Sequence, residues 1–147
     1  NDKYYFEATI DGTKKTYQYN SSAYLADTLD IHTMGIVCYV SATSKETFSL
    51  VISQTTGPIT TGTYVDDESM ADVRLVAGGF NPGTDDEDLT YGSGLETGSD
   101  PRLTIMISEL NATSIKGSFS GTFFDHAGDG PGKVAVTDGK FFLPLKK

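Results

Sequence analysis

The sequence predicts an all-β fold: an antiparallel two-sheet sandwich of about nine or ten strands, with a closed or partly open β-barrel as the alternative. Apolar residues recur at every second position, turn residues interrupt them about every 8–12 positions, and helical periodicity is almost absent. Three long connections, 20–30, 55–62 and 78–100, favour the sandwich, because strands that pass between two sheets need them. An up-and-down barrel would need mostly tight hairpins.

Two Asp-Gly pairs predict tight hairpins near the ends of the chain, because both residues of such a pair tolerate positive φ. Residues 11–12 follow the alternating stretch 4–10, and residues 138–139 separate two apolar stretches. Folding at these turns places apolar side chains opposite one another on one face. The predicted pairs are Phe6 with Tyr17, Tyr4 with Tyr19, Val136 with Phe141, and Val134 with Leu143.

Two further hairpins are predicted in the middle of the chain: 31–42 with 47–53 across the loop 44–46, and 102–110 with 114–124 across the turn 111–113. The first matches Val40 to Leu50 and Cys38 to Ile52, and the second matches Leu103, Ile105 and Ile107 to Gly121, Phe119 and Gly117. Phe119 is therefore expected to point into the core beside Ile105. The other expected elements are strands at 62–65, 73–77 and 89–91 and one short helical turn at 66–72.

The length of 147 residues predicts a single domain, 1–147, because a typical domain takes ~100–200 residues. The net charge of −9 opposes contact with phosphate backbones and anionic lipids, so we expect neither nucleic acid nor a membrane surface as a partner. The sequence has no run of about 18 apolar residues that would span a bilayer. The one cysteine, Cys38, lies in an apolar stretch, which predicts a core position and no intramolecular disulfide.

The sequence has no residue arrangement typical of a catalytic centre, so we predict no catalytic residue, no cofactor and no enzymatic activity. A nucleophile needs a base that a third group orients, and His32 and His126 lie far apart with no evident orienting partner. A pair of carboxylates in the acidic loops, as in glycoside hydrolases, is the alternative. Nothing in the sequence singles out such a pair.

Clusters of acidic residues make Ca²⁺ the one metal to consider, because hard cations bind several carboxylate oxygens. Residues 125–130 match part of a helix-flanked calcium loop, but Ala127 and Val136 stand where two of the ligands are required. Solvated acidic loops are therefore the favoured interpretation, and no metal site is predicted. The calcium candidates are Asp85, Asp86, Asp88, Asp125 and Asp129.

Aromatic platforms are typical of sugar-binding sites, and three tyrosines lie outside the predicted core pattern. Tyr5, Tyr24 and Tyr91 are accordingly the candidate ligand-binding residues, and ordinary strand and loop positions are the alternative interpretation. The sequons 20–22 and 111–113 match the N-glycosylation pattern, which short sequences often do by chance.

Strand-and-turn motifs recur along the chain at 5–12, at 59–64, and in a closing region that runs from 103–105 through 115–121 to 136–141. These motifs resemble the uncharacterised single-domain surface lipoproteins of Bacteroidetes, although Tyr17 stands where that family often has Trp. The resemblance implies export, a lipid anchor on a cysteine upstream of residue 1, a β-rich fold and no catalytic residue to carry over. In such exported proteins Asp27-Thr28-Leu29 also resembles an O-glycosylation signal, which would place Thr28 on an exposed loop.

Together these observations predict an exported, non-enzymatic β module, at the cell surface or in the periplasm, that binds a protein or a glycan through its loops. The alternatives are a hydrolase that uses the acidic-loop carboxylates and a barrel that encloses a small apolar ligand. A deep cavity would favour the barrel, and a carboxylate pair in a cleft would favour the hydrolase.

Overall fold

The computed structural model describes residues 4–17, 19–41, 43, 46–65, 73–81, 91–92, 103–125 and 133–146. The regular structure in these ranges consists of strands alone, which confirms the all-β prediction. The described residues therefore include no helix that is long and apolar enough to cross a membrane. The strands are β1 (Tyr5–Ile10), β2 (Thr13–Thr16), β3 (Tyr19–Asp27), β4 (His32–Tyr39), β5 (Thr47–Gln54), β6 (Gly62–Val65), β7 (Arg74–Asn81), β8 (Tyr91–Gly92), β9 (Thr104–Leu110), β10 (Ser114–Asp125) and β11 (Lys133–Lys146).

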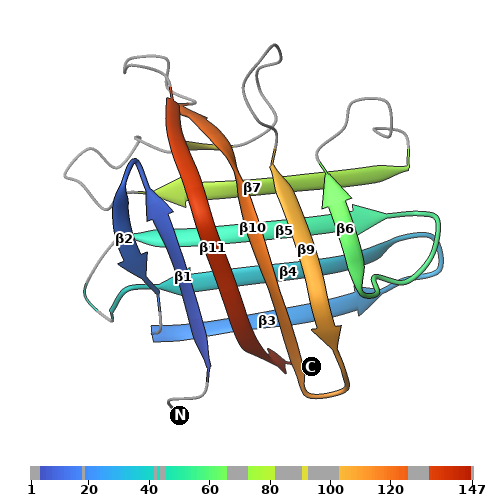
Figure 1. Ribbon diagram of the computed structural model, residues 1–147. Coiled ribbons are helices and arrows are strands. Elements are labelled where there is room, and N and C mark those ends of the chain that lie inside the picture. The colour runs from blue at the N-terminus through green and yellow to red at the C-terminus, as the bar shows by residue number, and fades with distance from the viewer. Residues whose placement is uncertain are drawn as a thin grey trace.

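The strands form two layers that cross at a steep angle (Figure 1). The back layer contains β3, β4, β5 and β7, and the front layer contains β2, β1, β11, β10, β9 and β6, each in that order of pairing. Alternate side chains of each strand point into the space between the layers, so the core lies there.

Hydrogen bonds join the two layers on both sides. β11 pairs in parallel with β3 through Leu145 and Lys146, and the short β8 pairs with β7 and with β10. The strands therefore form one curled sheet, close to a half-barrel, and not the two separate antiparallel sheets that the sequence predicts. The reason is the length of β10 and β11: their mutual register shifts partway along, the end of β10 pairs with β8, and the end of β11 pairs with β3 of the back layer.

The N-terminal hairpin confirms its prediction. Asp11 and Gly12 have φ angles of 48° and 86°, as a two-residue turn with positive φ at both positions requires. The backbone N–H of Tyr17 donates to the carbonyl oxygen of Phe6 at 2.7 Å, and the two rings lie edge to face with centroids 5.9 Å apart. Phe6 and Tyr17 are therefore partners, as the turn position implies.

The next segment differs from the prediction, because 20–30, expected as a connection, contains most of strand β3. Tyr19 faces Tyr39 of β4 instead of Tyr4. Ala23 is fully buried, whereas most of the strand after it is exposed. The segment therefore lacks the alternation that marks a strand in a sequence, and its pairing with β4 holds it extended.

The second Asp-Gly pair forms a bulge and not the predicted turn. β11 continues through Asp138 and Gly139, and its registers with β1 and with β10 both shift there. Asp138 takes a positive φ of 51°, while pairing on both sides keeps the strand extended. The predicted partners all face β10 instead: Val136 faces Gly121, Phe141 faces Gly117, Val134 faces Phe123, and Leu143 faces Ile115.

The hairpin of β9 and β10 is confirmed in position and register, with Phe119 opposite Ile105. Its turn is held by Asn111, whose Oδ1 accepts two backbone N–H groups at 2.9 and 3.0 Å. β6 lies where the sequence predicts it, and β7 is longer than predicted. The helical turn expected at 66–72 lies outside the described residues.

The hairpin of β4 and β5 is confirmed, but its register is four residues away from the predicted one. Cys38 faces Phe48 and not Ile52. β4 ends at Tyr39, and Val40 is exposed, so the connection is longer than the predicted loop. An even shift preserves which face each side chain occupies, and Cys38 is fully buried as predicted.

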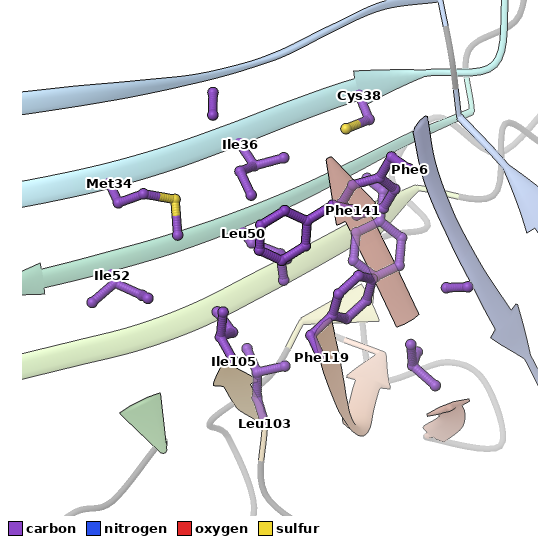
Figure 2. Close-up of a cluster of buried hydrophobic side chains, with 14 of the residues drawn as sticks. Phe6, Met34, Ile36, Cys38, Leu50, Ile52, Leu103, Ile105, Phe119 and Phe141 are labelled. Carbon is purple, nitrogen blue, oxygen red and sulfur yellow. The ribbon is translucent and has the colours of Figure 1, made fainter. Parts of the chain in front are cut away.

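Aromatic rings from both layers fill the core. Phe48 of β5 has ring contacts at centroid distances of 5.4–5.9 Å, and its partners are Phe6, Tyr17, Phe80, Phe119 and Phe123. Figure 2 shows aliphatic side chains of β4 and β5, such as Ile36 and Leu50, pointing toward the rings of the front layer. The buried hydrophobic side chains of the described strands form one cluster that includes residues of both layers.

Candidate functional site

The three candidate tyrosines do not form one site. Tyr5 lies on β1 in the front layer, with its ring 6.3 Å from that of Phe142. Tyr91 of β8 stacks on the core residue Phe80 at 6.0 Å. Tyr24 lies on β3 in the back layer and is 43% exposed. Of the three, Tyr24 is the one that presents a ring to solvent beside a groove.

Most of the acidic candidates lie outside the described residues. These are Asp85, Asp86, Asp88 and Asp129, together with His126, whereas Asp125 ends strand β10. Within the described ranges, no three His, Cys, Asp or Glu side chains are grouped closely enough to hold a metal ion.

The histidine of β4 has an orienting partner, which corrects the interpretation from the sequence. His32 Nδ1 lies 2.8 Å from Asp27 Oδ1 across the β3–β4 pair. The sequence conceals this contact, because 20–30 reads as a loop and Asp27 lies within it. Residues Asp27, His32, Gln54 and Arg74 stand side by side on four strands, and we call them the polar row.

The polar row connects the back layer to the loop before β6. Gln54 Nε2 donates to the carbonyl oxygen of Gly57 at 2.9 Å, and its Oε1 accepts from Arg74 Nε at 3.1 Å. The Arg74 guanidinium lies 5.0 Å from the ring centre of Tyr64. These contacts fix the segment 55–64 against the back layer, which is a structural role.

The outer face of the back layer carries no charged residue among the described positions. Side chains alternate between the two faces of each strand, and the pairing of β3, β4, β5 and β7 aligns the outward-facing residues of these strands in rows across the layer. We call this surface the neutral face. It consists of Ser22, Tyr24, Ala26, Thr33, Gly35, Val37, Tyr39, Thr47, Ser49, Val51, Ser53, Leu75, Ala77, Gly79 and Asn81.

The outer face of the front layer is charged, as expected for a surface in water. Lys14 Nζ lies 2.9 Å from Glu7 Oε2, and Lys116 Nζ lies 3.6 Å from Glu109 Oε2. Lys140 stands beside Glu7 on the neighbouring strand. The two outer faces of one sheet therefore differ sharply in charge, although both consist of exposed strand positions.

A groove of about 330 Å³ crosses the neutral face. Its lining includes Tyr24 and the small residues Gly35, Ser49, Ala77 and Gly79. A Cβ atom on Gly35 would overlap the outer end of the Tyr24 ring, so the missing side chain lets that ring lie against β4. Small residues thus form the floor of the groove, and the tyrosine forms one wall.

Two other hollows lie in the described part of the chain. One, of about 360 Å³, lies beside Glu7, Lys14 and Lys140, where Lys14 already pairs with Glu7. The other, of about 430 Å³, lies where Leu145 of β11 meets β3 and includes Leu25. Neither has an exposed aromatic ring in its lining, in contrast to the Tyr24 groove.

Among the described residues, the groups with clearly shifted pKa values are Cys38 and Tyr17, and both lie in the core. Burial raises the pKa of the Cys38 thiol to about 12, which keeps it protonated and unreactive. Burial and then a hydrogen bond to Glu46 raise the pKa of Tyr17. The neutral face presents hydroxyl, aliphatic and phenol groups, which suit binding and supply no strong acid or base.

The O-glycosylation motif lies at the turn between β3 and β4. Thr28 is exposed there, as predicted, and its Oγ1 donates to the carbonyl oxygen of Ile31 at 3.1 Å. Leu29 is 96% exposed at the tip. Modification of Thr28 stays a prediction.

No protein-family model matches the chain, and no curated protein or solved structure is significantly similar to it. The resemblance to surface lipoproteins therefore stays a prediction, and function has to be argued from the residues of the chain itself.

Proposed function

We propose that this protein is a non-catalytic binding module, exported and lipid-anchored at the cell surface or in the periplasm, that recognises a protein or a glycan. The recognition surface in this proposal is the neutral face, in place of the loops that sequence reasoning favours. The observation that carries the proposal is the open groove beside Tyr24 on the outer face of the back layer, whose described positions carry no charged residue.

The absence of charge is unusual enough to support a binding role. Soluble surfaces carry about 25–35% charged residues, which keep proteins from associating. The chain has 20 acidic and 11 basic residues, yet none of them occupies a described position of the neutral face. A surface that stays free of charge in so charged a chain is best explained by a ligand that covers it.

The two alternative functions have less support. A barrel that encloses a small ligand needs an internal cavity, whereas aromatic rings with centroids 5.1–5.4 Å apart occupy the space between the layers. A hydrolase needs a tuned carboxylate pair, and most of the acidic-loop candidates, Asp85, Asp86, Asp88 and Asp129, lie outside the described residues, so the described structure offers no observation in its favour.

The test is a charge placed in the groove. Val51 lies in the groove lining, and Val51→Lys would leave an ammonium group against any uncharged ligand. Ser120→Lys adds the same charge at an exposed position of β10 in the front layer. Both variants should keep the far-ultraviolet spectrum of the parent protein.

The measurement is binding to arrays of glycans and of cell-surface proteins, together with a turnover assay on each ligand found. We expect Val51→Lys to weaken binding about tenfold or more, Ser120→Lys to leave it unchanged, and the parent protein to leave its ligand intact. Equal binding by all three proteins, or cleavage of the ligand, would contradict the proposal.

A further inference from the structure

The aromatic wall of the groove is held in place before any ligand arrives. Tyr24 is 43% exposed, and the outer end of its ring lies over Gly35, the residue that faces it on β4. A ring supported on one side and open on the other loses little freedom when a ligand stacks on it. This arrangement suits a ligand that stacks the apolar face of a ring on the tyrosine.

Hydroxyl groups surround the wall. Thr33 Oγ1 and Ser53 Oγ lie 2.9 Å apart in the row next to Tyr24, so one donates to the other. Ser49 lies in the groove itself. A hydroxyl both donates and accepts hydrogen bonds, and this dual capacity matches the hydroxyl groups of a sugar.

Charge narrows the class of ligand. The described positions of the neutral face have no carboxylate that would pair with a basic peptide, and a nearby cation is Lys146 of β11, which pairs with Tyr24 at the edge of the face. The net charge of −9 also repels acidic polymers at long range. The ligand that fits is uncharged.

The size of the face argues against a folded protein. Four strands spaced ~4.8 Å apart and seven residues at ~3.3 Å each, the length from 33 to 39 of β4, cover roughly 440 Å². A stable protein interface buries about 800 Å² on each partner, which is nearly twice as much. The same comparison argues against a dimer that uses this face alone.

We infer that the neutral face binds an uncharged glycan, with one sugar ring stacked on Tyr24 and the sugar hydroxyls bonded to the neighbouring serine and threonine hydroxyls. This inference rests on the proposed function and specifies its ligand. Tyr24 is the residue that provides most of the affinity, and Gly35 is the positioning residue that supports its ring.

The experiment is affinity electrophoresis of the full chain in gels that contain starch, dextran, mannan or xylan as uncharged probes and polygalacturonate as the acidic probe. We expect retardation in at least one uncharged gel, unchanged when salt rises to about 0.5 M, because no charges are in contact. Tyr24→Phe should bind like the parent protein, and Tyr24→Ala should bind at least about tenfold more weakly.

Two further variants separate stacking from general effects. Tyr5→Ala removes a tyrosine of the front layer and should bind normally. Gly35→Ala keeps the tyrosine but displaces its ring, and should weaken binding at unchanged folding.

Three results would overturn the inference: no retardation in any uncharged gel, binding to polygalacturonate alone, or equal binding by Tyr24→Ala. If a protein ligand binds and Val51→Lys removes that binding, the proposed function stands and the glycan assignment fails. If neither glycan nor protein binds, both fail.

Discussion

Tyr17 and Cys38 show how single buried groups make the stability of this fold depend on pH. The Tyr17 hydroxyl donates to Glu46 Oε2 at 2.8 Å, and Lys15 Nζ lies 3.1 Å from the same oxygen. Both Tyr17 and Cys38 are fully buried, so ionisation of either would place a negative charge in the core. The fold therefore favours their protonated forms.

This preference predicts a loss of stability in alkali. The folded-state pKa of Cys38 is about 12 against an ordinary value of 9.0, so above pH 9 the unfolded chain releases a proton that the folded chain keeps. The free energy of unfolding should fall by up to about 1.4 kcal/mol per pH unit for each such group. Tyr17, whose pKa is also raised from 10.0, adds to this fall at higher pH.

Urea unfolding between pH 8 and pH 11 measures the effect. Cys38→Ala should remove the slope between pH 9 and pH 10, where the thiol titrates in the unfolded chain, and above pH 10 it should leave only the part of the slope that Tyr17 contributes. A variant whose slope equals that of the parent protein across the whole range would show that the thiol does not contribute.

At the level of single elements, the two Asp-Gly pairs show where sequence reasoning succeeds and where it fails. The pair at 11–12 forms the predicted turn, whereas the pair at 138–139 forms a bulge in the middle of β11. The dipeptide supplies positive φ in both places. Which structure results depends on whether another strand pairs across it, and β1 and β10 both pair with β11.

Strands with alternating apolar residues were predictable, and β3 was not. In β5 every second residue is buried, and the sequence identifies this strand directly. In β3 the strand is defined by its pairing with β4, which depends on residues far from it in the sequence. Tyr24 is therefore a candidate from the sequence alone, whereas its position opposite Gly35 and the existence of the neutral face depend on strand pairing that the sequence does not predict.

The bulge in β11 has no room for a side chain at Gly139. A Cβ atom on Gly139 would lie 2.6 Å from both the backbone oxygen and the ring of Phe119, so the strand itself would have to move. Gly139→Ala should therefore destabilise the protein by about 1–3 kcal/mol. Gly35→Ala is the matched control: its new Cβ would meet the outer end of the exposed Tyr24 side chain, which can turn toward solvent without moving the backbone, so the loss of stability should be small.

Urea unfolding of the two variants at neutral pH makes the comparison. An equal loss of unfolding free energy in Gly139→Ala and Gly35→Ala would show that β10 and β11 have room for an added methyl group at the bulge.

The whole molecule depends on rings that connect its two layers. Phe48 belongs to the back layer, and four of its five ring partners are Phe6, Tyr17, Phe119 and Phe123, which lie outside that layer. Because the hydrogen bonds between layers are confined to the short pairings of β8 and of the end of β11, side-chain packing carries much of the contact between them. Neither layer covers its apolar face without the other, so the two should unfold together.

We therefore predict a single unfolding transition, and we expect its midpoint to fall without the transition splitting when the ring cluster around Phe48 is disrupted. Phe48→Ala removes the ring that contacts five others and should cost about 3–5 kcal/mol, because a cavity remains between the layers. Phe142→Ala, which removes a half-buried ring from the outer face of the front layer, should cost distinctly less. Calorimetry and urea unfolding, followed by tyrosine fluorescence and circular dichroism, test both points. Two separate transitions in the parent protein, or coincident midpoints for the two variants, would mean that the layers are stabilised independently and that the rings do not couple them.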